Sequence, residues 1–192
     1  MMDIGLSNSI THFQLIELIK LEFSEELYIM KVIFLDIDGV LNSNFWNDTH
    51  QREISDGTLI DEEKVMLLGQ LIRNTSAKVI LHSGWKFWFD SEVKPLRREA
   101  ERLISMLAKE GIKVNGVTPD HTTEEIRKSK KFSLVKASEI LAWVSQYDNI
   151  EKWIVIDDLD LHNEEIRKHQ ILTDASIGLT VENICEAERL LL

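Results

Sequence analysis

Five short apolar runs alternate along the chain with amphipathic helical patterns, and this alternation restricts the fold more than any other feature. Each run is rich in β-branched residues and short enough to be a buried strand of a parallel sheet. The runs cover residues 31–35, 78–81, 112–117, 153–156 and 171–172. Because strands and helices in alternation favour right-handed crossovers, the sequence predicts an α/β fold with a doubly wound, mostly parallel five-stranded sheet.

The helices between these runs are predicted from apolar residues spaced three or four positions apart. One helix is expected to carry Asp61, Glu62 and Glu63 in its first turn, one to cover residues 96–107, and the last to cover residues 182–191. Ser133 is expected to cap the remaining helix, since its hydroxyl can accept a hydrogen bond from a free backbone N–H. The apolar stripe of that helix consists of Leu134, Ala137, Leu141 and Val144.

The length and composition fit one globular domain, because 192 residues with 44% apolar and 29% charged side chains can bury a core. Residues 30–192 are predicted to form this domain. Residues 1–29 would be an N-terminal extension. The spacing of Phe13, Ile16 and Ile19 favours a helix there, while Met30, directly before the first strand, leaves open that the biological start lies at that residue.

The chain has a single cysteine, Cys185, so a disulfide framework is excluded and a cytoplasmic location is expected. Cys185 itself is predicted to be a small core residue. No segment approaches the roughly 20 apolar residues of a membrane span. The net charge of −11 argues against a general nucleic-acid binder.

Two carboxylates, Asp36 and Asp38, follow the first predicted strand in the run KVIFLDIDGVLN. Side chains two residues apart on a strand point to the same side, where like charges repel. A divalent cation would remove that repulsion. The pair suits a phosphoryl transfer in which one carboxylate attacks phosphorus and the other handles protons.

Polar residues also follow two other strands, and the carboxyl ends of parallel strands are where ligands bind. Ser83 and Gly84 follow the second strand and could hold a phosphate oxygen. Asp157 and Asp158 close the fourth. Because Mg²⁺ prefers carboxylate oxygens, Asp158 is predicted to be a magnesium ligand, with Asp157 supporting it or orienting a lysine.

A lysine near the start of a later helix would offset the negative charge of nucleophile and phosphate. Lys136 is the preferred candidate, one helical turn in. Lys130 and Lys131, in the loop before it, are competitors.

Taken together, the motifs FLDIDGVLN, SGW, Lys136 and IDDLD resemble those of the haloacid dehalogenase-like (HAD) hydrolase superfamily over residues 31–192. The resemblance implies that Asp36 is the nucleophile and a magnesium ligand. It implies that Asp38 is the general acid/base and a ligand through its carbonyl. Ser83 and Lys136 would then bind the phosphoryl group.

A narrower resemblance is to the small HAD domains associated with RNA repair proteins, and more distantly to polynucleotide phosphatases. It rests on GVTP at residues 116–119, on KASEILAW and IDDLD, and on the closing TDASIGLT. Lys86 and Lys136 stand where that pattern would carry arginines, so charge is kept and bidentate arginine recognition is not. The resemblance implies a nucleotide or nucleic-acid end as substrate.

The intervals between the motifs leave no room for a sizeable cap domain, and an open site favours bulky substrates. Aromatic residues follow the first two motifs and could stack on bases or serve the core. They are Phe45, Trp46, Trp85, Phe87, Trp88 and Phe89. The histidines at positions 50, 82, 121, 162 and 169 show no metal-ligand spacing and are assigned no role.

The sequence thus predicts a magnesium-dependent phosphomonoester hydrolase that works through an aspartyl-phosphate. Three alternatives remain open: a non-catalytic binding module with this fold, a repair subunit whose unknown protein partner supplies specificity, and a small-metabolite phosphatase.

Overall fold

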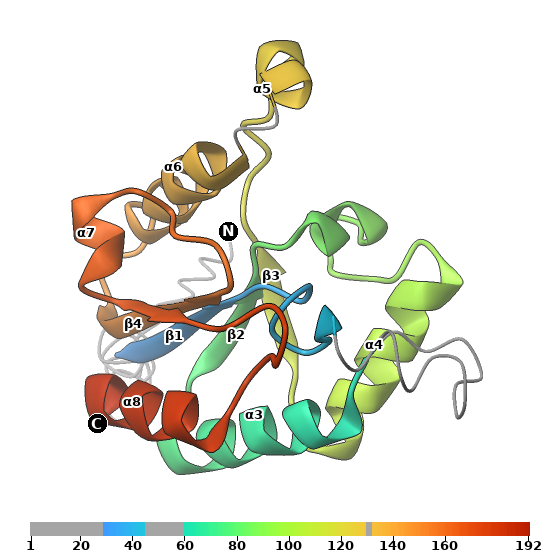
Figure 1. Cartoon of the computed structure of the whole chain (residues 1–192), viewed down its shortest axis with the longest axis vertical. Coiled ribbons are helices and arrows are strands. Elements are labelled where there is room, and N and C mark those ends of the chain that lie inside the picture. The colour runs from blue at the N-terminus through green and yellow to red at the C-terminus, as the bar shows by residue number, and fades with distance from the viewer. Residues whose placement is uncertain (1–28, 45–59, 130–131) are drawn as a thin grey trace, which may run out of the picture.

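The computed structural model describes residues 29–44, 60–129 and 132–192, and it contains one five-stranded parallel sheet in the order β3-β2-β1-β4-β5 (Figure 1). The strands are β1 (Met30–Leu35), β2 (Lys78–Leu81), β3 (Val114–Val117), β4 (Ile150–Asp157) and β5 (Gln170–Leu172). Chain order and sheet order differ in the way that right-handed crossovers from a central strand produce. The predicted α/β fold with a doubly wound parallel sheet is confirmed.

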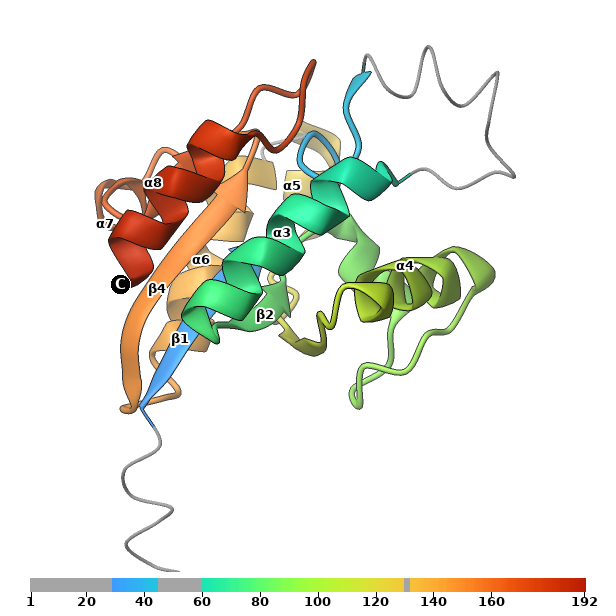
Figure 2. The same cartoon turned by 90° about the horizontal axis from the view of Figure 1, so that it is seen from below.

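Helices cover both faces of the sheet. The longer ones are α3 (Glu62–Thr75), α4 (Arg98–Lys109), α6 (Phe132–Val144) and α8 (Val181–Leu191). The short ones are the 3₁₀ helix η1 (Gly84–Trp88), α5 (Glu124–Ser129) and α7 (Glu164–Arg167). In Figure 2, α3 and α8 lie in front of the strands and α6 lies behind them, which gives a three-layer arrangement.

The central strand β1 shows why both faces are covered. Val32 and Phe34 belong to the apolar cluster under α6 and α7, whereas Ile33 and Leu35 belong to the cluster under α3, α4 and α8. Alternation along the strand sends successive side chains to opposite faces, so a strand that is apolar throughout needs a helix layer on each side.

The strand register brings the predicted motifs to one edge. Leu35, the last residue of β1, is the partner of Leu81 in β2 and of Ile156 in β4. The residues that follow these three positions therefore emerge side by side at the carboxyl edge of the sheet.

Two helix predictions were wrong in detail. Helix α6 begins at Phe132, so Ser133 lies inside it, and Leu134 is 52% exposed. The buried face of α6 instead includes Val135 and Glu139. The Glu139 carboxylate can be buried because it forms an ion pair with Lys86. Helix α4 begins at Arg98, which leaves Leu96 in the preceding loop and 65% exposed.

The prediction that Cys185 is a core residue was also wrong, since this side chain is exposed. Its neighbours Ile184 and Ala187 face the sheet, and a helical step of one residue turns Cys185 toward solvent. None of the described helices is long and apolar enough to cross a membrane.

No separate cap domain occurs in the described ranges, which agrees with the expectation of a capless domain. The predictions for the extension before residue 29 lie outside the described residues. So do those for Phe45, Trp46, Lys130 and Lys131 and for the histidine at position 50.

Candidate metal and phosphate site

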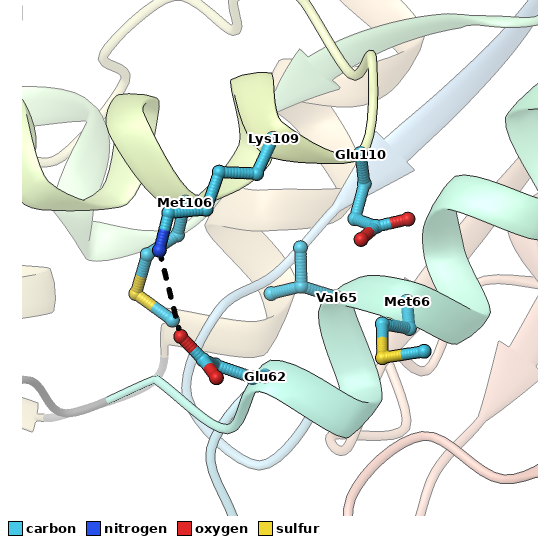
Figure 3. Close-up of a pocket in the computed structure, with 6 residues that line it drawn as sticks. All are labelled: Glu62, Val65, Met66, Met106, Lys109 and Glu110. Carbon is cyan, nitrogen blue, oxygen red and sulfur yellow. Dashed lines mark ion pairs between the residues drawn. The ribbon is translucent and has the colours of Figure 1, made fainter.

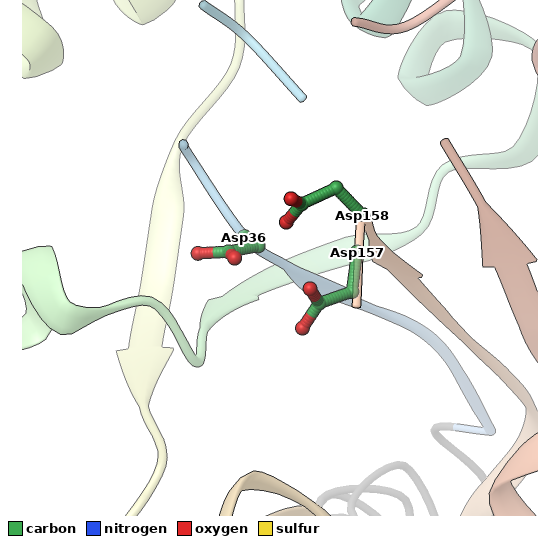
Figure 4. Close-up of side chains that lie close together, drawn as sticks. All are labelled: Asp36, Asp157 and Asp158. Carbon is green, nitrogen blue, oxygen red and sulfur yellow. The ribbon is translucent and has the colours of Figure 1, made fainter. Parts of the chain in front are cut away.

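Three carboxylates, those of Asp36, Asp157 and Asp158, converge at the carboxyl edge of the sheet (Figure 4). One oxygen of each lies within 4.8 Å of the others. Asp36 directly follows β1 and Asp157 ends β4, so the cluster results from the pairing of these two strands. Asp36 and Asp157 are buried and Asp158 is half-buried. The sequence predicted this convergence.

Lys136 joins two of these carboxylates from helix α6. Its Nζ donates to Asp36 Oδ2 at 2.6 Å and to Asp157 Oδ2 at 2.8 Å. Burial alone would lower the pKa of Lys136, but the two carboxylates raise it above its usual value, so the ammonium stays charged. Lys136, the preferred candidate, lies at the cluster, whereas its competitors Lys130 and Lys131 lie outside the described residues. The placement also gives Asp157 the predicted contact with a lysine.

One ammonium does not balance three carboxylates, and their pKa values reflect this. Burial would raise the pKa of Asp36, but the Lys136 ammonium and other partners hold it below its usual range. Burial, with the charge on Asp36 added, raises the pKa of Asp157 to about 6. Burial and the neighbouring Asp157 likewise raise the pKa of Asp158 to about 6. The cluster therefore carries excess negative charge that a cation would stabilise.

A glycine turn makes room for Asp158. Gly39 has φ of +71°, and a Cβ built there would lie 2.5 Å from Asp158 Cγ. Its carbonyl accepts a hydrogen bond from Thr173 Oγ1 at 2.9 Å, which ties the turn to the segment after β5. The positive φ and the close approach both require glycine.

The Asp38 side chain does not join the carboxylate cluster. Strand β1 ends at Leu35, so strand alternation does not carry as far as Asp38 and the expected pairing with Asp36 is not formed. Its carboxylate accepts hydrogen bonds from Trp85 Nε1 and Asn42 Nδ2, both at 3.0 Å. Trp85 is a partner that sequence reasoning missed. A metal contact through the Asp38 carbonyl stays a prediction.

Ser83 and Gly84 follow β2 on the same edge. Ser83 is fully buried and caps η1, with its Oγ accepting from Trp85 N at 3.3 Å. Gly84 is exposed, and a Cβ added to it would meet nothing within 4 Å. The free space beside the exposed Gly84 backbone suits an incoming oxygen group.

His82 is a site residue that was given no role from the sequence. It is buried, with Nε2 3.6 Å from Asp157 Oδ2, and its Nδ1 has no hydrogen-bond partner among the described atoms. Burial, helped by the nearby Lys136 ammonium, lowers the pKa of His82 to about 3. The imidazole is therefore neutral at pH 7. The feature of the sequence that could have identified His82 as a site residue is its position directly before Ser83, at the end of the strand.

Lys86 and Glu139 form a second buried ion pair, at 2.6 Å, between η1 and α6. Lys86 Nζ also donates to Pro119 O at 2.6 Å, and Glu139 Oε1 accepts from His121 N at 2.9 Å. The pair holds the middle of α6, the helix that carries Lys136, against the segment that follows β2. Glu139 lies in the KASEILAW run and Lys86 directly follows SGW, but their contact depends on the fold.

A further pocket lies between α3 and α4 and contains none of the predicted site residues (Figure 3). An ion pair of 3.6 Å between Lys109 and Glu62 crosses it. Its lining residues are Glu62, Val65, Met66, Met106, Lys109 and Glu110.

Residues 32–184 match the family model described as the HAD domain in Swiss Army Knife RNA repair proteins. The chain is thus a HAD-type domain, the class that the fold and the carboxylate cluster had indicated. Within that class it belongs to the family of HAD domains found in Swiss Army Knife RNA repair proteins. No curated protein and no solved structure matches it significantly. Membership of a HAD family indicates a hydrolase.

Proposed function

We propose that the protein is a magnesium-dependent phosphomonoester hydrolase that works through a phosphoryl group on Asp36. The observation that carries the proposal is the convergence of Asp36, Lys136 and Asp158 at the carboxyl edge of the sheet, the edge at which Gly84 also follows its strand. A nucleophile, a fixed ammonium and a carboxylate set for a cation are the parts that phosphoryl transfer needs.

In the first step, an Asp36 carboxylate oxygen attacks phosphorus and forms a P–O bond while the ester P–O bond breaks. Asp38 donates its proton to the departing oxygen, which leaves as an alcohol. In the second step, Asp38 accepts a proton from water as that water attacks phosphorus. The bond to Asp36 then breaks, inorganic phosphate leaves, and Asp38 is protonated again.

Three contacts prepare Asp36 and Asp38 for these roles. Lys136 keeps Asp36 ionised, so that the carboxylate is available as a nucleophile. The two hydrogen bonds to the Asp38 carboxylate fix its direction. Restricting both groups to one geometry lowers the entropic cost of reaching the transition state.

The carboxylates of Asp36, Asp157 and Asp158 fit Mg²⁺, which prefers hard oxygen donors. When bound, Mg²⁺ would neutralise charge that develops on the phosphoryl oxygens. The room that Gly39 leaves for Asp158 supports this assignment.

We infer a nucleotide or a nucleic-acid end as the preferred substrate class. The family description, which names RNA repair proteins, supports this inference. The lack of a cap domain in the described ranges also supports it, because a site without a cap admits a bulky leaving group.

The replacement Asp36→Asn tests the proposal, with Asp148→Asn on an exposed loop as the matched control. We expect Asp36→Asn to abolish magnesium-dependent phosphate release from an aryl phosphate, while circular dichroism and the melting temperature show a folded protein. The control should retain wild-type turnover. Equal turnover in both variants would refute the mechanism. A wild-type protein that binds phosphate esters without hydrolysing them would favour the binding-module alternative.

A further inference from the structure

The four aromatic residues after β2 have different surroundings in the structure. Trp85 and Phe89 are buried, with 5% and 7% of their surface exposed. Trp88 is half-buried, with its ring 4.4 Å from that of Trp85 and the Arg97 guanidinium 5.0 Å from it. Phe87 differs, because 51% of its surface is exposed. Three of the rings thus serve packing, and Phe87 is the one that presents an open aromatic face.

The 3₁₀ geometry of η1 explains this division. In a 3₁₀ helix, side chains three residues apart lie on the same face. Trp85 and Trp88 share one face, which packs inward. Gly84 and Phe87 share another, and this face is exposed at both positions. The exposed ring therefore lies one turn from the glycine that is proposed to meet the phosphoryl group.

Contacts of Lys86 link the residue before Phe87 to helix α6. The Phe87 ring centroid lies 5.4 Å from Lys86 Nζ, and that ammonium lies 2.6 Å from Glu139 Oε2. Glu139 is three residues after Lys136 on α6, so the two side chains are neighbours on that helix. The buried Lys86–Glu139 pair therefore holds η1, which carries Phe87, against the helix that carries Lys136.

We propose that Phe87 forms a stacking subsite for the nucleobase of the substrate, which makes it a specificity-determining residue. The proposal rests on the proposed phosphatase function. A nucleotide carries a phosphate and an aromatic base on one sugar, so a single molecule can contact Gly84 and Phe87 together. Stacking accepts every base, because each base has a π-face.

The test compares a nucleotide with ribose 5-phosphate, which offers a similar phosphoester and no base. The quantity measured is the selectivity, defined as kcat/KM for the nucleotide divided by kcat/KM for ribose 5-phosphate. Nucleotides with a 3′- and with a 5′-phosphate are both assayed, and the better substrate is used. We expect Phe87→Ala to lower the selectivity about 5- to 160-fold, the range that corresponds to loss of one base-stacking contact.

Three further variants sharpen the result. Phe87→Trp retains an aromatic face and should preserve the selectivity. Phe87→Leu retains apolar bulk without a ring and should behave as Phe87→Ala does. Leu96→Ala removes another exposed apolar side chain, 65% exposed, and should keep the wild-type selectivity.

A selectivity that stays at the wild-type value in Phe87→Ala would overturn the stacking subsite, as would an equal loss in Phe87→Leu and Phe87→Trp. Wild-type protein that hydrolyses ribose 5-phosphate and ignores every nucleotide would also overturn it, while the phosphatase function would stand. Wild-type protein that hydrolyses neither substrate nor an aryl phosphate would refute the phosphatase function itself, before any variant is compared.

Discussion

Replacing Lys136 with methionine should destabilise the metal-free protein strongly. The Lys136 Nζ lies 2.6 Å from Asp36 Oδ2 and 2.8 Å from Asp157 Oδ2, and the three side chains are 13%, 6% and 0% exposed. At an effective dielectric constant of about 20, each contact contributes about 6 kcal/mol of Coulomb attraction, most of which desolvation offsets. Removing one partner of such a buried pair costs about 3–5 kcal/mol, since the remaining charges are left uncompensated.

Unfolding by urea in EDTA at pH 7 measures this loss, and a thermal scan should show a fall in Tm of about 6–20 °C. The control is Lys168→Met, because Lys168 makes an equally short ion pair with Glu165 while both side chains are mostly exposed. That variant should lose far less stability, because solvent screens an exposed ion pair.

The cost of Lys136→Met should also depend on pH. The pKa of Asp157 is raised to about 6, so at pH 5 this carboxylate is mostly neutral and one of the two ion pairs is weakened. We expect roughly half of the pH 7 cost at pH 5. Saturating Mg²⁺ should restore more stability to the variant than to the wild type, because the cation replaces the missing positive charge. A loss no larger than that of the control, independent of pH and of Mg²⁺, would refute the reasoning.

Three more outcomes are expected. Gly39→Ala should lower the free energy of unfolding by about 1–3 kcal/mol and weaken the Mg²⁺-induced rise in Tm, because φ at this position is +71° and the new Cβ would meet Asp158. The control Gly111→Ala, at φ +73° with open space around it, should lower it less and leave the Mg²⁺ response intact. The pKa of Asp157 and that of Asp158 are raised to about 6, so Mg²⁺ affinity measured by calorimetry should fall as pH drops through 6, and a constant affinity from pH 7.5 to 5 would contradict this. The pKa of His82 is lowered to about 3 in the folded protein, so below pH 6.5 the unfolded state binds a proton that the folded state does not. The free energy of unfolding of the wild type should therefore fall by about 2 kcal/mol between pH 6.5 and 5 because of this group. His82→Asn should lack that part of the pH dependence in urea unfolding.

The sheet and its functional edge could be predicted from the sequence because strand pairing leaves little freedom. A chain of short buried strands joined by helices places every strand end at one edge, so Asp36, Ser83 and Asp157 had to converge if the alternation was read correctly. The order of the strands, β3-β2-β1-β4-β5, was not part of the prediction and comes from the structure.

The contacts among side chains could not be predicted in the same way. Whether Asp38 faces Asp36 or Trp85 depends on where β1 ends, and apolar periodicity defines boundaries poorly. The burial of Glu139 in α6 depends on Lys86, which is 53 residues away in the chain. His82 lacked metal-ligand spacing, and its role as a buried neutral neighbour of Asp157 becomes visible only once β2 and β4 flank β1.

The most direct test of the account is to find the phosphoryl group on Asp36. Excess protein is mixed with a phosphomonoester and Mg²⁺, quenched in acid within milliseconds, digested, and mapped by mass spectrometry. We predict one phosphoryl group on the peptide that contains Asp36, which is absent in Asp36→Asn. Rapid hydrolysis with no label on that peptide at any quench time, or with label on another residue, would contradict the proposed mechanism.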